Sequence, residues 1–219
     1  MGYPLVCRSY KNSVFTNNRA EEPTFNYFQT PDIFVQEFRN ITEQRLDKKR
    51  TGRLLGRGMP NIYKGKSDTH YIFSSTFFDI DDNGNFYVIY MADSLIYKYD
   101  KNYVPLYSLG FEGRSMDKEY IPVINIEDIQ GKGIAQYKTK GYYTWVEYID
   151  ELDYLLRSYS KGSQEVSDGL QIYQNRTLVA EIDVPKGFRP IGYIKPYIFS
   201  DAIIDEEKMR IYVYRMKLE

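Results

Sequence analysis

The clearest pattern in the chain is a group of four short apolar and aromatic runs, separated by turn residues, between residues 77 and 114. The runs span residues 77–81, 86–91, 95–100 and 104–109. Segments of this length that are rich in Phe, Tyr, Ile and Val favour β-strands. Four antiparallel strands with tight turns in fewer than about 50 residues predict one blade of a β-propeller.

The turn between the first two runs carries the strongest hairpin signal in the chain. Asp82-Asn83-Gly84-Asn85 separates the two predicted strands. An Asn-Gly pair favours a type I′ turn, in which both central residues need a positive φ. We therefore expect a type I′ hairpin turn here, with Gly84 at positive φ.

The blade pattern recurs loosely along the chain. Three pairs of segments resemble each other at blade-like spacing: 54–58 and 108–113, 148–150 and 99–100, and 202–214 and 79–90. The pattern predicts an all-β fold of about four to five propeller-type blades, each with four antiparallel strands. We expect one domain over residues 1–219, with blade repeats from residue 51 and an open arc rather than a closed ring.

The two ends of the chain are harder to assign. Residues 1–50 show no clear blade repeat, although Phe25, Tyr27 and Phe28 suit strands, and we expect this segment to cap the arc. Residues 33–46 could form a short helix. Residues 210–218 predict a long terminal strand, which needs a neighbour because an unpaired strand edge invites self-association.

Composition supports the β prediction and disfavours one function class. The chain has 23 Tyr and 12 Phe, residues that pack well on a pleated surface. Its net charge of −1 disfavours a dedicated nucleic-acid binder, which would be clearly basic. Basic residues gather between Arg45 and Arg57, where we expect a solvated loop and strand edge rather than a contact patch.

Neither the cysteine content nor the hydropathy of the chain identifies its cellular compartment. Cys7 is the single cysteine, so no disulfide forms within one chain. No apolar run approaches the roughly 20 residues of a membrane-spanning helix. The first residues, from Met1 to Arg8, do not read as a signal peptide. We expect either a cytoplasmic protein or an exported one without its signal.

Two motifs only partly match known binding loops. Residues 79–84 read D-x-D-x-N-G, the first half of a calcium loop in which Asp79, Asp81 and Asn83 would be ligands. Tyr87 and Tyr90 occupy the ninth and twelfth positions, so the closing carboxylate is absent, and we expect a turn without metal. Residues 60–67 resemble a phosphate loop, but they lack its leading glycine and the following helix.

Catalytic chemistry finds little support. His70 is the single histidine, lies beside a strand-like run and reads as structural rather than as a catalytic base. Paired carboxylates, as in a glycosidase, remain open because they meet in space rather than in sequence. Trp145, Tyr142 and Tyr143 are candidate platforms for sugar stacking, although blade packing is the simpler interpretation.

The segments from Phe78-Asp79-Ile80-Asp81 through Tyr97-Lys98-Tyr99-Asp100 to Gly110 resemble a blade of the TolB-like six-bladed β-propeller lipoproteins of bacterial envelopes. Three segments near the carboxyl end are also similar: 168–173, 181–185 and 192–197. The resemblance spans roughly residues 54–218. It implies an exported, lipid-anchored, non-catalytic binding or scaffold protein. The chain departs from the family because Val6 replaces the small residue expected before Cys7, and its length is short for six blades.

We therefore expect a non-catalytic cell-envelope binding or scaffold protein that contacts protein or glycan. The alternative is a carbohydrate-active enzyme with paired carboxylates on a propeller scaffold, and a third interpretation is a cytoplasmic interaction module. We expect no catalytic residue, metal, cofactor or nucleic-acid partner. The sequence leaves the binding residues unassigned. The expected location is the periplasm or cell envelope for an exported chain, and the cytoplasm otherwise.

Overall fold

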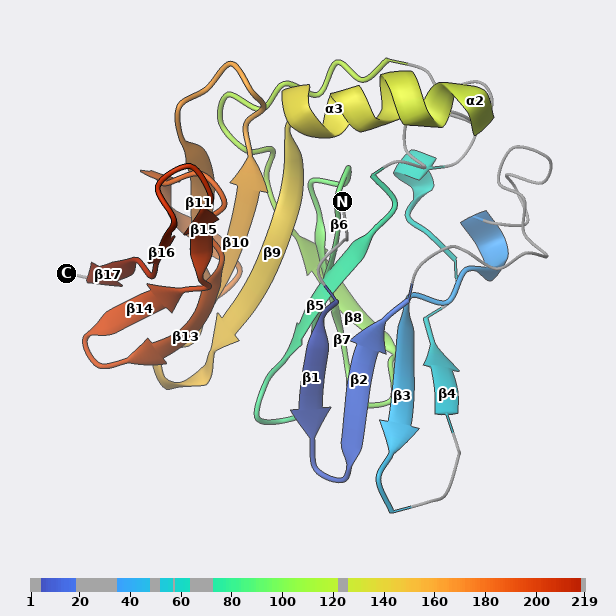
Figure 1. The fold of residues 1–219 in the computed structure, drawn as a ribbon. Coiled ribbons are helices and arrows are strands. Elements are labelled where there is room, and N and C mark those ends of the chain that lie inside the picture. Colours follow the sequence, from blue (N-terminus) through green and yellow to red (C-terminus); the bar gives the residue numbers. More distant parts are fainter. Residues whose placement is uncertain are drawn as a thin grey trace.

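The computed structural model describes residues 5–18, 35–47, 52–56, 58–63, 73–121 and 126–217. Over these residues the chain forms three four-stranded antiparallel sheets, one three-stranded sheet and one two-stranded sheet (Figure 1). The four larger sheets follow one another in chain order, and we call them blades 1 to 4. The predicted all-β, blade-type fold is confirmed, with four blades.

The blades take their strands from consecutive stretches of chain. Blade 1 contains β1 (Cys7–Tyr10), β2 (Ser13–Asn17), β3 (Ile41–Arg45) and β4 (Gly52–Leu55). Blade 2 contains β5 (Thr76–Ile80), β6 (Phe86–Tyr90), β7 (Ile96–Tyr99) and β8 (Pro105–Leu109). Blade 3 contains β9 (Tyr142–Ile149), β10 (Tyr154–Ser160), β11 (Asp168–Gln174) and β12 (Thr177–Val184). Blade 4 contains β13 (Pro190–Ile194), β14 (Tyr197–Ser200) and β17 (Arg215–Lys217).

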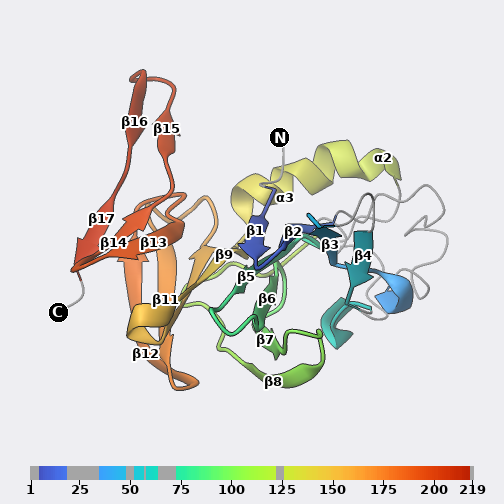
Figure 2. The ribbon, with the colours of Figure 1, turned by 90° about the horizontal axis from the view of Figure 1, so that it is seen from below.

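The first strands of the blades lie side by side in chain order. β1 contacts β5, β5 contacts β9, and β9 contacts β13. In Figure 2 the blades fan out from these strands, with blade 1 on the right and blade 4 on the left. A helical segment joins blade 2 to blade 3 and lies across one end of the fan: α2 (Ile126–Asp128), a π-helical turn (Ile129–Gly133) and α3 (Ile134–Thr139). The blades therefore form an arc, as the sequence predicts.

The core lies between neighbouring blades. All five residues of β6 are buried, because blade 2 is covered on both of its faces at this strand. The outermost strand β8 is mostly exposed, although its sequence is also apolar. One cluster of buried side chains runs through blades 1 to 3, and a second joins blade 3 to blade 4. Packing between blades, rather than within one sheet, thus holds the arc together.

A buried arginine joins blade 3 to blade 2. Arg157 on β10 is 0% exposed, and its guanidinium donates to the carbonyl oxygens of Ser94 and Phe111, each 2.6 Å away. It also donates to Gln171 Oε1 at 3.0 Å and lies 4.0 Å from the ring centroid of Tyr143. Within the described ranges no carboxylate pairs with it. Carbonyl dipoles and an aromatic face therefore offset this charge, since a buried cation needs such partners.

Of the three predicted repeats, one occupies equivalent positions in two blades. Gly56 and Gly110 each follow the outermost strand of a blade and have positive φ values of 85° and 140°. A Cβ atom on Gly110 would lie 2.3 Å from the Ser94 carbonyl oxygen, so glycine is required there. The second pair is out of register, because Tyr99 ends the third strand of blade 2 whereas Tyr148 lies on the first strand of blade 3.

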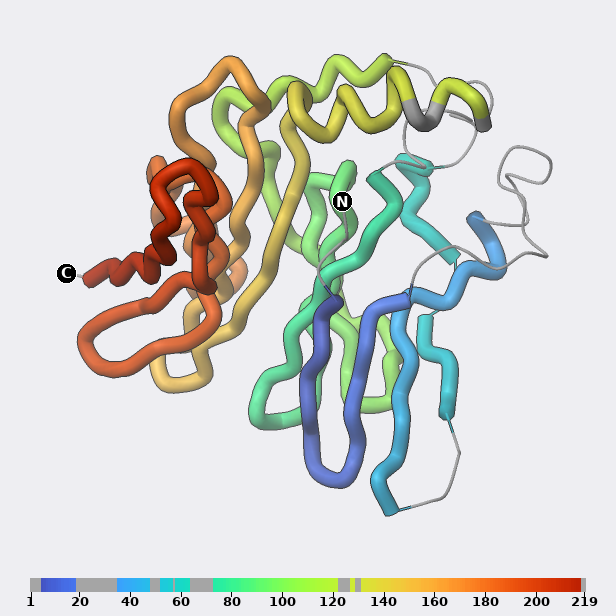
Figure 3. Tube along the Cα trace, in the orientation of Figure 1, coloured from blue at the N-terminus to red at the C-terminus, as the bar shows by residue number. Residues whose placement is uncertain are grey.

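The predictions of the third repeat and of one long terminal strand are both wrong, for the same reason. β15 (Ile203–Asp205) and β16 (Arg210–Tyr212) form a separate hairpin inserted between β14 and β17 of blade 4. Figure 3 traces the chain from β14 through this hairpin and back to the sheet. Tyr214 donates its backbone N–H to Ser200 Oγ at 2.8 Å, and this bond holds the chain where it returns from the hairpin to the sheet. The run 210–218 is therefore two short strands rather than one.

The amino-terminal segment belongs to a blade. β1, β2, β3 and β4 pair in chain order in one sheet, so residues before Leu54 complete blade 1 instead of capping the arc. The predicted helix over 33–46 is mostly wrong, because within the described residues 35–46 the helix covers 35–37 alone and 41–45 form β3. Phe25, Tyr27 and Phe28 lie outside the described residues.

The hairpin turn between β5 and β6 differs in type from the prediction. Gly84 has a φ of 85°, as expected, but Asn83 does not have a positive φ, so the turn is not type I′. Gly84 donates its N–H to the Asp81 carbonyl at 2.8 Å, and Asp81 pairs with Asn85 across the turn. This is a three-residue loop that ends on a left-handed glycine. The Asp81 carboxylate stabilises it by accepting the N–H groups of Asn83 and Asn85.

Candidate functional site

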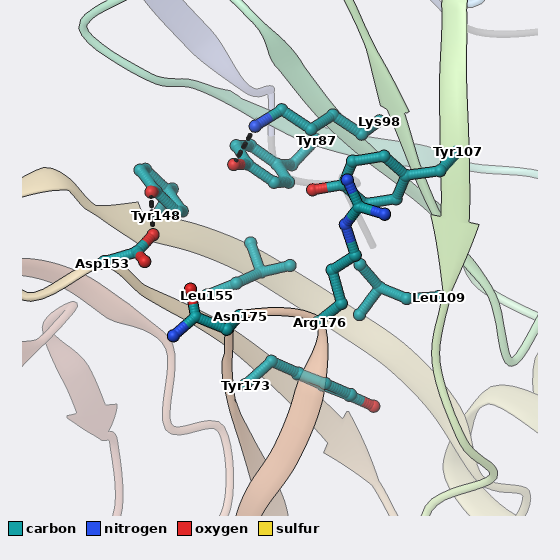
Figure 4. A pocket seen from close by; sticks show the side chains of 10 residues that line it. All are labelled: Tyr87, Lys98, Tyr107, Leu109, Tyr148, Asp153, Leu155, Tyr173, Asn175 and Arg176. Carbon is teal, nitrogen blue, oxygen red and sulfur yellow. Dashed lines mark hydrogen bonds between the residues drawn. The ribbon is translucent and has the colours of Figure 1, made fainter.

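A pocket of about 210 Å³ lies between blades 2 and 3 (Figure 4). Both blades contribute tyrosines and polar side chains to its walls. Blade 2 supplies Tyr87, Lys98, Tyr107 and Leu109, and blade 3 supplies Tyr148, Asp153, Leu155, Tyr173, Asn175 and Arg176.

Strand register builds each wall from a row of directly paired residues. In blade 2, Lys98 on β7 pairs with Tyr87 on β6 and with Tyr107 on β8. In blade 3, Leu155 on β10 pairs in the same way with Tyr148 on β9 and Tyr173 on β11. Paired residues point to the same face of a sheet. Two rows therefore face each other across the boundary between the blades.

Aromatic contacts close the pocket at two places. Tyr87 stacks on Tyr148 with ring centroids 4.6 Å apart and planes 13° from parallel. Elsewhere along the walls, the Arg176 guanidinium lies 3.9 Å from the ring centroid of Tyr107. Both contacts join blade 2 to blade 3. The space between them has aromatic walls and polar groups at its edges (Figure 4).

The polar groups of the pocket are held in place by neighbours. Lys98 Nζ donates to Tyr87 Oη at 2.5 Å and lies 3.5 Å from Asp81 Oδ2. The Tyr148 hydroxyl donates a hydrogen bond to the Asp153 carboxylate. Burial raises the pKa of both Tyr87 and Tyr148, so both phenols stay neutral. Lys98, Arg176 and Asp153 therefore carry the fixed charge of the lining.

The three aromatic residues singled out in the sequence belong to the core. Tyr143 is 0% exposed and Trp145 is 7% exposed, so neither offers a free face to a sugar. Tyr142 is half-buried and packs 5.4 Å from Phe73, measured between ring centroids. The blade-packing interpretation of these residues is confirmed.

A second cluster of charged side chains joins the first strands of blades 1, 2 and 3. Arg8 on β1 donates to Asp79 Oδ1 on β5 at 2.6 Å and to Glu147 Oε2 on β9 at 2.7 Å. Asp79 also accepts the N–H of Tyr148 at 2.7 Å, and Trp145 Nε1 donates to Glu147 at 3.2 Å. Burial, followed by the charge of Asp79, raises the pKa of Glu147.

In this cluster two carboxylates, those of Asp79 and Glu147, share one bridging group. The bridge is a guanidinium rather than a water or a sugar, and it occupies an oxygen of each acid. The arrangement links three blades through one side chain.

The remaining sequence candidates are placed as follows. The carboxylate oxygens of Asp79 and Asp81 accept the hydrogen bonds described above. No cluster of three or more His, Cys, Asp and Glu suited to a metal occurs in the part of the chain that the structure describes. The absence of calcium binding stays a prediction. Cys7 is exposed on β1. His70 and residues 64–67 of the phosphate-loop-like segment lie outside the described residues.

The basic stretch is partly neutralised at the surface. Arg45 pairs with Asp47 at 2.6 Å, and Arg53 pairs with Glu43 at 2.9 Å. Lys48, Lys49, Arg50 and Arg57 lie outside the described residues. No helix among the residues that the structure covers is long and apolar enough to cross a membrane.

No family model matches the chain, and no curated protein matches its sequence. Among solved structures, a member of the DUF4221 family from Bacteroides vulgatus matches with a TM-score of 0.64 and 10% sequence identity. The match covers 90% of this chain and 58% of that chain. Dihydro-heme d1 dehydrogenase NirN in complex with DHE matches with a TM-score of 0.40 and 11% identity, over 97% of this chain and 37% of that chain, too weakly to support an argument.

The first of these similarities concerns the fold alone, because the identity is low. It supports a propeller-type architecture, and it does not extend to the TolB-like lipoprotein family specifically. The chain spans 58% of the length of this neighbour. Fold similarity and blade topology together show a propeller-type arrangement of four blades.

Proposed function

We propose that this chain is a non-catalytic binding protein of the cell envelope that takes a glycan in the pocket between blades 2 and 3. The observation that carries the proposal is the pair of facing residue rows, which brings the half-buried Tyr107 and Tyr148 to one site and backs them with the buried Tyr87 and Tyr173. A tyrosine ring offers a flat apolar face and a hydroxyl group, and a sugar ring has both kinds of surface.

The size of the pocket favours a sugar over a protein partner. Its volume of about 210 Å³ lies below the roughly 300–1,000 Å³ of sites for drug-sized ligands, so it suits one small ring. A stable protein contact would need about 800 Å² on each partner. A narrow slot between two blades does not offer such an area.

The lining also supports binding rather than catalysis. Asp153 is the single carboxylate among the pocket residues, and it accepts a hydrogen bond from the Tyr148 hydroxyl. Glycoside hydrolysis by the usual mechanism needs two carboxyl groups about 5–9.5 Å apart around the scissile bond. The pocket therefore suits recognition of a sugar without cleavage.

The location in the cell envelope rests on the resemblance to TolB-like blades. Fractionation of the native source with an antibody to this chain tests it. Recovery with the periplasmic or membrane-associated fraction is the expected result, and recovery with the cytosol would favour the cytoplasmic interaction module.

A glycan array tests the binding function directly. We expect the wild-type protein to retain a defined set of glycans and the Tyr107→Ala variant to lose affinity by about tenfold or more, which corresponds to about 1.4 kcal/mol. Tyr197→Ala is a matched control, because Tyr197 also contacts an arginine, at 4.7 Å from Arg215, but lies outside the pocket. Equal loss in both variants would contradict the proposal.

A carbohydrate-active enzyme is the second candidate, and the Asp79–Glu147 pair favours it. A raised pKa on one acid beside a second acid is the pattern of a general acid and its partner. Hydrolysis assays on the glycans retained by the array separate the candidates. Product formation that the Glu147→Gln variant abolishes would establish the enzyme, whereas unchanged glycans support the binding protein.

A further inference from the structure

The turn between β11 and β12 holds an arginine where the backbone favours glycine. Gln174 pairs with Thr177, so Asn175 and Arg176 form a two-residue loop. Their φ values are 48° and 67°. Two positive φ values define a type I′ turn, in which Asn suits the first position and Gly the second. An arginine in the left-handed region is strained, and such strain points to a role for the side chain.

The strained turn delivers the Arg176 guanidinium to the pocket. The group lies 3.9 Å from the Tyr107 ring centroid, which brings blade 3 against blade 2. Arg176 is exposed, and no acceptor or carboxylate in the described ranges takes its N–H groups. A guanidinium stacked on a ring keeps its edge free, and that edge matches a carboxylate in a two-bond contact.

A second cation faces the same ring. Lys98 Nζ lies 5.9 Å from the Tyr107 centroid and 4.5 Å from the Tyr87 centroid. Its side chain is 15% exposed, and its hydrogen bond to Tyr87 fixes it among the tyrosines. Tyr107 thus lies between two positive charges from different blades.

One charge of the lining is left without a partner in the described ranges. Lys98 is paired with Asp81, and Asp153, the one acid of the pocket lining, accepts a hydrogen bond from Tyr148, whereas Arg176 has no acidic partner. The tyrosines are neutral donors and aromatic faces. A ligand that complements this lining has a ring to stack and a negative group to set against Arg176.

We propose that the pocket selects an acidic glycan, in which a sugar ring carries a carboxylate that Arg176 binds, with Lys98 close to the same tyrosine, Tyr107. This inference rests on the proposed glycan-binding function and names the class of sugar. Tyr107 contacts the ring, and the Arg176 guanidinium supplies the paired hydrogen bonds to the carboxylate.

Calorimetric titration with matched ligands tests the inference. The probes are oligosaccharides of glucuronate, galacturonate and mannuronate, the methyl ester of each, and the corresponding neutral sugars. The ester keeps the shape of the ring and removes the charge. We expect at least one acid to bind about tenfold or more tightly than its ester, a preference of about 1.4 kcal/mol. We also expect this preference to weaken as salt is added.

The Arg176→Gly variant separates the role of the arginine side chain in binding from any effect on folding. Glycine suits the turn, so the variant should fold with an unchanged or higher melting temperature. We expect it to lose the preference for the acid, so that the acid and its ester bind with equal affinity. Arg215→Ala, which removes the arginine of the Tyr197 pair outside the pocket, should keep the preference.

The outcomes separate the two proposals. Equal affinity for acid and ester, or a preference that survives in Arg176→Gly, overturns the acidic class while glycan binding stands. Binding of sugar phosphates without binding of uronates also overturns the carboxylate assignment. If no oligosaccharide binds, the proposed glycan-binding function itself fails.

Discussion

Arg157 on β10 donates a hydrogen bond to the carbonyl oxygen of Ser94, 2.6 Å away in the turn between β6 and β7. The bond crosses from blade 3 to blade 2, the same boundary that forms the tyrosine pocket. A buried guanidinium that satisfies carbonyls of another blade fixes the spacing of the two sheets. The pocket therefore depends on a contact that lies behind it.

We predict that Arg157→Met destabilises the protein by about 3–5 kcal/mol, since it removes the buried donor that the Ser94 and Phe111 carbonyls and the Gln171 side chain share. Urea unfolding followed by tryptophan fluorescence measures this change. Arg53→Met is the control, because Arg53 makes an exposed ion pair with Glu43 that contributes at most about 1 kcal/mol. Similar losses in the two variants would show that Arg157 does not join the blades as described.

Gly84 provides a second test of the fold. A Cβ atom at this position would lie 2.6 Å from the ring of Tyr10, and the φ of 85° is strained for other residues. We predict that Gly84→Val destabilises the protein by about 1–3 kcal/mol. Gly84→Ala in a Tyr10→Ala background separates the causes, because the double variant removes the contact and keeps the strain. A melting temperature unchanged in Gly84→Val would contradict the turn geometry.

Stability should depend on pH through Glu147. Burial and the charge of Asp79 raise the pKa of Glu147 in the folded protein. Between the ordinary pKa of Glu and this raised value, the folded protein keeps a proton on Glu147 that the unfolded protein releases. This contribution to stability is complete below about pH 4.3, the ordinary pKa of Glu, and is lost as the pH rises through the raised value. We predict that Glu147→Gln flattens this decline. Denaturation profiles of both proteins that stay parallel across the pH range would refute the assignment.

Self-association is expected through the hairpin that interrupts blade 4. β15 and β16 pair with each other alone, and two-stranded units are marginal in isolation. Met209 is 91% exposed and Ile211 is 69% exposed. We predict a concentration-dependent mass in light scattering, reduced in the Met209→Lys, Ile211→Thr variant. A strictly monomeric wild-type protein at high concentration would count against open edges.

The sequence predicts blade 2 well because its signals are local. The runs at 77–81, 86–91, 95–100 and 104–109 coincide with β5 to β8, since apolar strands alternate with short polar turns there. The sequence does not predict blade 1, because its signals are weak and far apart. Cys7–Tyr10 and Ile41–Arg45 contain few apolar residues, and a long segment separates β2 from β3. Blade 4 is obscured by the inserted hairpin, which breaks the spacing of its strands.

The pocket could not be found in the same way. Tyr107 and Tyr148 have ordinary positions in their strands, and only the packing of one blade against the next brings their rows together. Periodicity along a chain carries no information about which faces meet. One local signal was available: Asn175-Arg176 stands between two strand-like runs, where an Asn-Gly pair would be expected.

A crystal structure with the best glycan from the array tests the central claim most directly. The account predicts electron density for a sugar ring against Tyr107, between blades 2 and 3, with its carboxylate within hydrogen-bonding distance of Arg176. Density for the glycan beside Arg8, Asp79 and Glu147, with the tyrosine pocket empty, would contradict it.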